Sequence, residues 1–361
     1  MNIRAGMLQT IELKHTWMKT NLPPLTLAVL FALVLNATAD TRYVDLNSPS
    51  PTPPYTNWLT AATNIQDAID AAVSGDLVLV TNGVYGSGGV VVPAIGLLTN
   101  RVAVTKAVNV LGVNGPAVTI IQGNQVFGST NGNSAVRCVY LGNNSSLSGF
   151  TLTNGATRTN GATTDLFGGG IYCQTGFGCN VTNCVIVGNS AAARGGGVYQ
   201  GFFINSQIIS NVSGLGGGAY GSLLNYSTVS GNAAINSIYG IAGGGANLGT
   251  LVGCTISGNY SSNGGGGVAD GTLRQCVLDS NKAFVGGGST GGYLENCLIM
   301  NNVADIFGGG TYQGSLLNCT VVNNSALSYG HVDSNHRGGG THLSTCQNCI
   351  VYFNTDRKSV V

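Results

Sequence analysis

A unit of about 22 residues recurs through the second half of the chain, and it constrains the fold more than any other feature. Each copy contains a six-residue segment that begins with cysteine or serine and ends with asparagine, as in CVLDSN. The segments begin at Cys184, Ser206, Ser227, Cys254, Cys276, Cys297, Cys319 and Cys349, with spacings of 22, 21, 27, 22, 21, 22 and 30 residues. Repeats of this length are typical of solenoids, in which each unit packs only against its neighbours.

Positions within the unit differ in character. The third residue of the segment is always aliphatic, whereas the second and fourth vary freely, which predicts a short strand with one buried face. A second apolar column lies three residues before each segment. The third-position column is Ile186, Ile208, Val229, Ile256, Leu278, Ile299, Val321 and Val351, and the earlier column is Val181, Phe203, Leu224, Leu251, Leu273, Leu294, Leu316 and Cys346.

The sixth position of the segment is asparagine in every aligned copy. In stacked coils these side chains would lie at one bend, about 4.8 Å apart along the axis. We expect asparagine to adopt left-handed backbone geometry there, and its amide to bond to the asparagines above and below. The predicted structural ladder is Asn189, Asn211, Asn232, Asn259, Asn281, Asn302, Asn324 and Asn354.

Two solenoid folds are compatible with this period. Segment 273–288 matches the leucine-rich-repeat string, with Cys276 in place of one leucine, but that fold needs a helix or an apolar turn in its second half. Here the second half is a triple glycine with small residues, and glycine opposes helix by roughly 1 kcal/mol per residue. Glycine suits bends and close backbone approach instead. The sequence therefore predicts an all-β fold, a right-handed parallel β-helix with about 22 residues per coil, its hand following the general rule for parallel crossovers.

The residues before the repeats predict a cap for the solenoid. Segment 63–72, TNIQDAIDAA, has the pattern of an amphipathic helix, with Thr63 and Gln66 at the spacing of a capping box. Segment 75–80, GDLVLV, is expected to begin the first coil. A helix in this place would cover apolar rungs that the first coil otherwise exposes.

The expected organisation has five parts: an export signal at 1–39 whose natural start is Met18, a linker at 40–60, the cap and first coils at 61–135, the repeat domain at 136–355, and a tail at 356–361. The signal is indicated by an apolar core too short to span a bilayer and by the small residues ATA at 37–39, which place the mature N-terminus at Asp40. The tail DRKSVV matches the translation of a common sequencing-adapter DNA. We expect it to be an artefact, and the natural protein to continue past Thr355.

Charge content and the length of apolar runs argue against a nucleic-acid partner and against a membrane-spanning helix. Only 7% of the residues are charged and the formal net charge is +1, so the basic surface of a nucleic-acid-binding protein is not expected. The mature chain has no apolar run long enough for a membrane helix. We therefore predict neither a nucleic-acid partner nor a membrane-spanning segment.

The helix pattern followed by GDLVLVTNGVY resembles the N-terminal entry of the right-handed parallel β-helix repeat proteins of bacteria. The recurring GGG-x-Y … NC-x-I-x-x-N is similar to the repeats of polymorphic outer-membrane proteins and related autotransporter passengers. This resemblance covers about residues 43–355. It implies a β-helix fold, and it leaves function open because members include polysaccharide lyases, glycosidases and adhesins. Unlike the autotransporters, the 361 residues include no C-terminal membrane barrel, which the expected truncation at Thr355 would have removed.

The cysteine column invites a redox or metal interpretation. Ser206 and Ser227 replace cysteine without disturbing the pattern, which favours a buried ladder of small side chains instead. The C-x-x-C motif at 346–349 falls into two different columns and is weak as a zinc motif. Cys173 and Cys179 are the predicted disulfide pair, because an exported chain meets an oxidising environment. No metal site and no cofactor are predicted.

Two groups of residues are candidates for ligand binding. Tyr172, Tyr199, Tyr220 and Tyr312 each follow a triple glycine, and they form either an aromatic strip that binds sugar rings or a self-stacked ladder that stabilises the coils. The longest aligned unit is expected to project a loop, which either binds a ligand or is simply solvated. Its candidate residues are His331, Asp333, His336, Arg337 and His342.

Function is predicted mainly from what the repeats lack. Acidic residues in the repeats are few and fall in different columns, so no pair of carboxylates suited to glycosidic cleavage is implied, and no catalytic residue is assigned. We predict an exported, monomeric, non-catalytic module at the cell surface or outside the cell, adhesin-like or structural, with a polysaccharide or a cell-surface partner. The alternative is a β-helix polysaccharide lyase or glycoside hydrolase.

Overall fold

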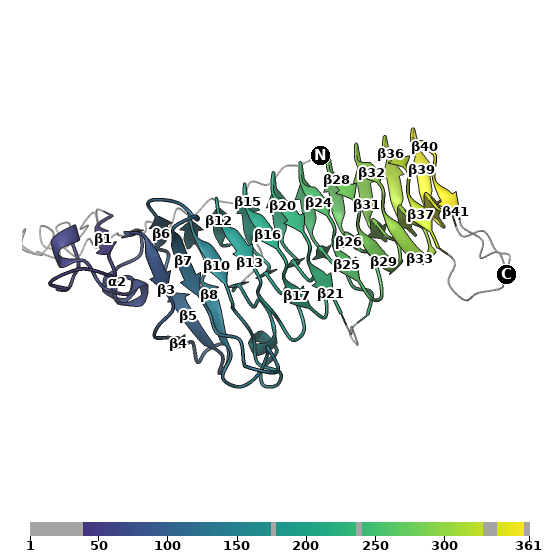
Figure 1. The fold of residues 1–361 in the computed structure, drawn as a ribbon. Coiled ribbons are helices and arrows are strands. Elements are labelled where there is room, and N and C mark those ends of the chain that lie inside the picture. The colour runs from purple at the N-terminus through teal and green to yellow at the C-terminus, as the bar shows by residue number, and fades with distance from the viewer. Residues whose placement is uncertain (1–38, 175–177, 236–239, 328–337, 357–361) are drawn as a thin grey trace, which may run out of the picture. The chain divides into compact units, whose positions relative to one another are not determined.

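The computed structural model describes residues 39–174, 178–235, 240–327 and 338–356 (Figure 1). These residues form a right-handed parallel β-helix, which confirms the predicted fold class. Segments 1–38 and 357–361, which hold most of the predicted export signal and tail, lie outside the described residues. Within the described part, no helix has the length and apolarity needed to cross a membrane.

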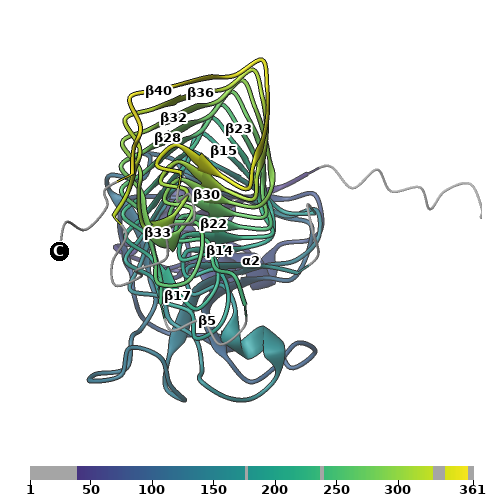
Figure 2. The ribbon, with the colours of Figure 1, turned by 90° about the vertical axis from the view of Figure 1, so that its right-hand side faces the viewer.

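Three long sheets form the walls of the coil (Figures 1 and 2). Sheet A contains β1 (Thr41–Val44), β2 (Leu77–Val80), β6 (Asn109–Gly112), β9 (Ser146–Ser148), β12 (Asn180–Thr182), β15 (Phe202–Ile204), β19 (Leu223–Asn225), β23 (Thr250–Val252), β27 (Thr272–Arg274), β31 (Tyr293–Glu295), β35 (Ser315–Leu317) and β39 (Thr345–Gln347). Sheet B contains β3 (Gly83–Tyr85), β7 (Thr119–Gln122), β10 (Thr151–Thr153), β13 (Val185–Val187), β16 (Gln207–Ile209), β20 (Thr228–Ser230), β24 (Thr255–Ser257), β28 (Val277–Asp279), β32 (Leu298–Met300), β36 (Thr320–Val322) and β40 (Ile350–Tyr352). Sheet C contains β4 (Val90–Val91), β5 (Thr99–Val104), β8 (Val136–Leu141), β11 (Ile171–Cys173), β14 (Val198–Tyr199), β18 (Ala219–Tyr220), β22 (Ala246–Asn247), β26 (Val268–Ala269), β30 (Ser289–Thr290), β34 (Thr311–Tyr312) and β38 (Thr341–His342). All these pairings are parallel except β4 with β5.

A fourth sheet, called the short sheet below, lies beyond the asparagine bend. Its strands are β17 (Val212–Ser213), β21 (Ala233–Ala234), β25 (Tyr260–Ser261), β29 (Lys282–Val285), β33 (Val303–Phe307), β37 (Ser325–Ala326) and β41 (Thr355–Asp356). In Figure 2 the strands β14, β22 and β30 of sheet C lie between sheets A and B and the short sheet. Each full coil therefore passes through sheets C, A and B and then the short sheet.

Both predicted apolar columns face the core, and all their members are buried except Cys346 and Val351 in the last described coil. Leu251, Leu273 and Leu294 are register partners in sheet A, and Ile256 and Leu278 are partners in sheet B. All five are 0% exposed. The alternation of the sequence therefore assigned the inward face of both sheets correctly.

The asparagine column forms a continuous ladder at the bend between sheet B and the short sheet. Asn281 is typical: its amide nitrogen donates to the side-chain oxygen of Asn302 and to the backbone oxygen of Ile256, both at 2.9 Å. Its own side-chain oxygen accepts from the backbone and side-chain nitrogens of Asn259, at 3.0 and 2.9 Å. The expectation of left-handed backbone geometry at asparagine was wrong, because the positive φ belongs to the preceding residue, such as Ser280 at 55°.

The triple glycine packs directly against the asparagine ladder and the short sheet. A Cβ on Gly217 would lie 2.3 Å from the backbone oxygen of Ala233, and one on Gly218 would lie 2.9 Å from the side chain of Asn232. Real Cβ atoms essentially never lie within 3.0 Å of another heavy atom, and Gly218 would also meet the backbone oxygen of Gly245 at 2.6 Å. The first glycine, Gly216, has a φ of +62° that side chains rarely adopt. A side chain is therefore excluded at each of the three positions, by backbone conformation at the first and by close contacts at the other two. The triple glycine allows the chain to pack tightly against the asparagine ladder.

The N-terminal cap differs from the prediction in two details. The helix α2 (Ile65–Ala71) is capped by Asn64, whose side chain accepts from the backbone nitrogen of Asp67 at 2.8 Å, so the capping box does not begin at Thr63. Gln66 instead reaches the next coil, where its side chain pairs with both backbone groups of Ala103 in β5.

Segment 40–60, predicted as a linker, contains ordered elements. It holds β1, the first strand of sheet A, which pairs with β2 over four residues. It also holds the short helix η1 (Trp58–Thr60). The prediction of a linker rested on the polar, proline-rich stretch 47–54. The strand lies just before that stretch and was therefore missed.

Candidate functional site

Sheet C carries a ladder of stacked aromatic side chains on the face turned away from the main core. Tyr140, Tyr172, Tyr199 and Tyr220 lie in register on β8, β11, β14 and β18. Successive ring centroids are 6.0, 5.1 and 5.7 Å apart, with interplanar angles of 10°, 11° and 6°. Because each ring face covers the next, the ladder offers ring edges and hydroxyl groups to a ligand rather than open ring faces.

The N-terminal end of this ladder is covered. Tyr140 and Tyr172 are 2% and 5% exposed. Phe167 and side chains from segment 90–95 and the helix η2 (Thr163–Leu166) pack against them. Tyr199 and Tyr220 are half-buried, so only the second half of the ladder is accessible.

A buried arginine fixes the covering segment. The Arg137 guanidinium donates to the backbone oxygens of Thr164, Phe167 and Gly168, at 2.7 to 2.9 Å, and lies 4.8 Å above the ring centre of Tyr172. Burial lowers the pKa of Arg137 to about 10, so the side chain stays charged at neutral pH. This role could not be predicted from the sequence, because Arg137 lies outside the aligned repeats.

Arg194 places a positive charge at the accessible rungs. Its guanidinium carbon lies 5.1 Å from the ring centre of Phe167 and 4.9 Å from that of Tyr220. Burial raises the pKa of Tyr199, and the positive charge of Arg194 partly opposes this rise. Arg194 is half-buried. Stacking between two rings holds the planar cation in one orientation.

A second aromatic group lies farther along the same column of sheet C. Tyr312 and His342 are register partners on β34 and β38, and their ring centres are 5.7 Å apart. Phe307, at the end of β33, stacks on both, at 6.1 and 4.8 Å. Between Tyr220 and Tyr312 the column holds the small or polar residues Asn247, Ala269 and Thr290.

The structure divides the candidate binding residues, the tyrosines and the loop residues, differently from the sequence prediction. His342, predicted as part of a projecting loop, belongs to the tyrosine column. The other loop candidates, His331, Asp333, His336 and Arg337, lie outside the described residues. Tyr140 and Phe307 were missed because no triple glycine precedes them, and Arg194 was missed because only its stacking partners reveal its role.

A polar hollow of about 480 Å³ lies beside the accessible rungs. Gln125 and Asn131 fix its outer wall, donating to the backbone oxygen of Gly188 and the hydroxyl of Ser190, both at 2.8 Å. The described lining also includes Ser213 and contains no charged side chain. Because segment 191–194 runs from this hollow to Arg194, the two features are neighbours on the surface.

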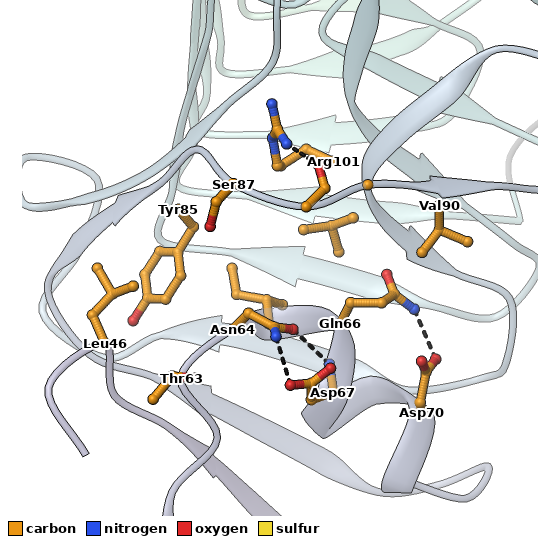
Figure 3. A pocket seen from close by; sticks show the side chains of 14 residues that line it. Leu46, Thr63, Asn64, Gln66, Asp67, Asp70, Tyr85, Ser87, Val90 and Arg101 are labelled. Carbon is orange, nitrogen blue, oxygen red and sulfur yellow. Dashed lines mark hydrogen bonds between the residues drawn. The ribbon is translucent and has the colours of Figure 1, made fainter. Parts of the chain in front are cut away.

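A smaller hollow of about 260 Å³ lies between α2 and the first coils (Figure 3). Several of its polar side chains bind one another or the backbone: Asp70 accepts from Gln66 at 2.8 Å, and Tyr85 donates to the backbone oxygen of Thr81 at 3.1 Å. Burial raises the pKa of Tyr85 to about 12. We assign this hollow to the joint between the cap and the coils.

The thiols of the cysteine column act as core groups. Cys276 donates to the backbone oxygen of Leu251, one coil earlier, at 3.3 Å, and burial raises the pKa of Cys184 to about 12. Cys173 and Cys179 carry free thiols, the Cys179 thiol donates to the backbone oxygen of Leu141 at 3.3 Å, and a disulfide between the two cysteines stays a prediction. Among the described residues, no group of three or more His, Cys, Asp or Glu side chains could hold a metal ion.

The acidic side chain next to the aromatic ladder has a structural task. Asp165, on η2, is 2% exposed and accepts from the backbone nitrogens of Leu97 and Leu98, at 2.9 to 3.1 Å. Two other carboxylates pair with surface cations, Glu295 with Arg274 at 3.2 Å and Asp305 with Lys282 at 3.7 Å.

Fold and surface together define a parallel β-helix repeat protein with a cationic, aromatic strip on one wall. No family model and no curated protein matches the sequence. The fold is similar to that of a rhamnogalacturonan lyase (11% identity, TM-score 0.40, 86% of this chain and 87% of that one) and of pectate lyase Pel9A (12%, 0.41, 90% and 79%). It is also similar to the tailspike protein gp49 of Acinetobacter baumannii bacteriophage Fri1, a capsular polysaccharide depolymerase (11%, 0.41, 89% and 63%).

Proposed function

We propose that this protein is an exported, non-catalytic β-helix module that binds an acidic polysaccharide on the outer face of sheet C. The observation that carries the proposal is the placement of Arg194, half-exposed between Phe167 and Tyr220. A planar guanidinium with a fixed orientation suits the two oxygens of a carboxylate or sulfate group.

The polar hollow extends this surface. Its neutral amide and hydroxyl groups, including those of Gln125 and Ser213, can donate to and accept from sugar hydroxyls. A polymer chain that lies along segment 191–194 would contact Arg194 and the hollow at once, and two linked contacts raise the overall affinity.

Binding rather than cleavage is proposed because Asp165, the acid beside the strip, is buried and already accepts from two backbone amides. In the same sense we propose that the module acts outside the cell or at its surface, as an adhesin-like protein similar to autotransporter passengers. Incubation with an acidic polysaccharide should release no new reducing or unsaturated ends. Release of such ends by the purified protein would favour the alternative, a β-helix lyase or hydrolase.

The test is calorimetric titration with polygalacturonate as the acidic probe and dextran as the neutral one. Replacement of Arg194 by Gln should weaken binding of polygalacturonate about tenfold, because one charge-assisted contact is lost. Tyr226→Ala is the matched control, since Tyr226 is 64% exposed at the corner between sheets A and B. Equal binding by the parent protein and Arg194→Gln, or tighter binding of dextran than of polygalacturonate, would contradict the proposal.

A further inference from the structure

The first strand begins next to the predicted cleavage site. The small residues at 37–39 predict hydrolysis after Ala39, and β1 starts at Thr41. Ala39 and Asp40 are exposed, so a peptidase can reach the bond between them. The new N-terminus would therefore lie at the edge of the folded cap.

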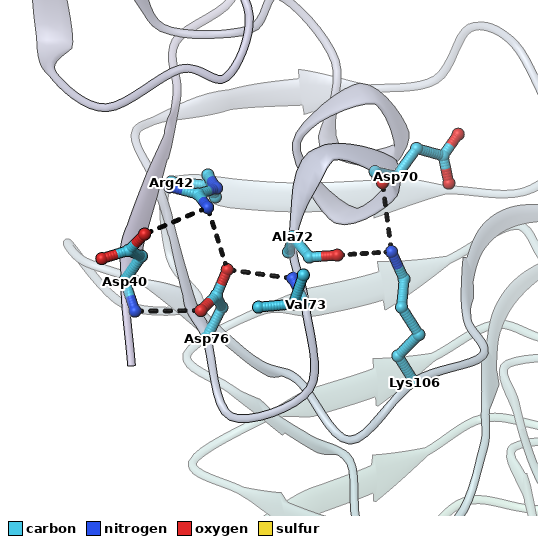
Figure 4. A network of polar contacts seen from close by, with 7 residues as sticks. All are labelled: Asp40, Arg42, Asp70, Ala72, Val73, Asp76 and Lys106. Atoms are coloured by element: carbon cyan, nitrogen blue, oxygen red, sulfur yellow. Dashed lines mark hydrogen bonds and ion pairs between the residues drawn. The ribbon is translucent and has the colours of Figure 1, made fainter. Parts of the chain in front are cut away.

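The backbone nitrogen of Asp40 already points at a buried carboxylate (Figure 4). It donates to Oδ1 of Asp76 at 2.9 Å. Asp76 is 0% exposed and also accepts from the backbone nitrogen of Val73 at 3.0 Å. The carbonyl oxygen of Asp40 accepts from Leu77 at 2.9 Å, which fixes the residue on both sides.

The charges around Asp76 are unequal in the uncut chain. Arg42 is the cation in contact with it, with its Nη2 atom 3.2 Å from Asp76 and 3.4 Å from Asp40. Lys106, the next cation in Figure 4, donates to the backbone oxygens of Asp70 and Ala72 instead. Two carboxylates therefore share one guanidinium, and an additional positive charge at this point would balance them.

We propose that removal of the leader supplies this charge, so that the α-ammonium group of Asp40 forms an ion pair with Asp76 and locks the cap. In the reaction, water and a signal peptidase hydrolyse the Ala39–Asp40 peptide bond, leaving a carboxylate on Ala39 and an amino group on Asp40. An α-amino group has a pKa of about 8, so it is protonated at neutral pH. The inference rests on the export part of the proposed function and is independent of polysaccharide binding.

The pH dependence follows from the groups that face the amine. The carboxylates of Asp76 and Asp40 favour its charged form and outnumber the opposing guanidinium of Arg42, so its pKa in the folded protein should be above its unfolded value. The stabilisation is then fully present below about pH 8 and is lost as the pH rises through the folded-state pKa.

The experiment compares two proteins released from a fusion partner, one beginning at Asp40 and one beginning at Ala39. Both carry one α-ammonium group, so they have the same charge and differ only in where it lies. At pH 6.5 the Asp40 form should unfold at a midpoint roughly 2–4 °C higher, and the difference should vanish above the pKa of the amine. Equal midpoints at pH 6.5 would overturn the proposal.

Two further variants assign the effect to the ion pair. Asp76→Asn should abolish the difference between the two forms, whereas Asp70→Asn should preserve it, because the Asp70 side chain pairs with Gln66. Should Asp76→Asn fail to fold, the rate of selective N-terminal acylation against pH gives a second readout on the parent chain. It should report a higher amine pKa for the Asp40 form than for the Ala39 form, and equal values would overturn the ion pair.

The mass of the protein secreted from a bacterial host separates failure of export from failure of the ion pair. A first residue of Asp40 is expected. A different first residue would overturn the cleavage step and leave polysaccharide binding untouched, whereas a loss of polysaccharide binding alone would leave the cleavage step untouched.

Discussion

Asn281 uses its side chain entirely inside the stack. It donates two hydrogen bonds and accepts two, and it is 1% exposed. The side chain of Asp279, two residues earlier, accepts only from the side chains of Asn301 and Ser280 at the surface. Two neighbouring polar residues in one segment therefore have very different energetic roles.

Replacing Asn281 by Ala should lower the free energy of unfolding by roughly 2–4 kcal/mol, since several buried groups lose partners that are each worth about 1 kcal/mol. Asp279→Ala is the control and should change it by less than about 0.5 kcal/mol, as for most surface positions. Denaturant unfolding followed by circular dichroism checks both. Losses of equal and large size would show that the ladder is not what holds this bend.

The position of the left-handed residue at the asparagine bend could not be predicted from the sequence. The asparagine column was visible because it never varies, but the left-handed residue before it is Gly188, Ser210 or Phe353 in different coils. Left-handed geometry tolerates several residue types when the neighbouring hydrogen bonds impose it. A single-residue preference therefore pointed to the wrong position.

At the scale of elements, α2 is fixed by a cap and by a bridge to the next coil. Asn64 accepts from the backbone of Asp67, and Gln66 pairs with the backbone of Ala103. Ile65, Ala68 and Ile69 pack into the core. The helix pattern gave its position and inward face, whereas the partner of Gln66 is 37 residues away in the sequence and could not be foreseen.

We predict that Asn64→Ala lowers the free energy of unfolding by about 1 kcal/mol, the usual loss for an N-cap. Thr63→Ala tests the position that the sequence favoured as the cap, and it should have little effect. Urea unfolding of the two variants distinguishes them. A larger loss at Thr63 than at Asn64 would mean that the helix begins one residue earlier than described.

At the scale of the whole molecule, the periodic core was predictable and the functional surface was only partly so. The repeat fixed which residues face inward, because every coil must bury the same columns. Tyr199, Tyr220 and Tyr312 were found from their place after the glycines. Arg194 lies in a coil of regular length, at the position that Phe167 and Leu215 occupy in the neighbouring coils, so its charge has no periodic signal. The cover over Tyr172 comes from segments outside the aligned repeats.

We propose that sheet C presents its binding surface at Tyr199 and Tyr220, beyond the segments that cover Tyr140 and Tyr172. The stacked rings leave edges and hydroxyls exposed, and Arg194 adds the charge. The remaining walls carry the regular coil. A ligand should therefore protect a narrow and predictable part of the chain.

Hydrogen–deuterium exchange with and without polygalacturonate tests this claim most directly. The account predicts slower exchange in peptides that contain residues 191–199 and 213–220, with little change in sheet B peptides such as 277–281. Protection confined to sheet B or to the cap, or no protection at a ligand concentration that saturates binding, would contradict it.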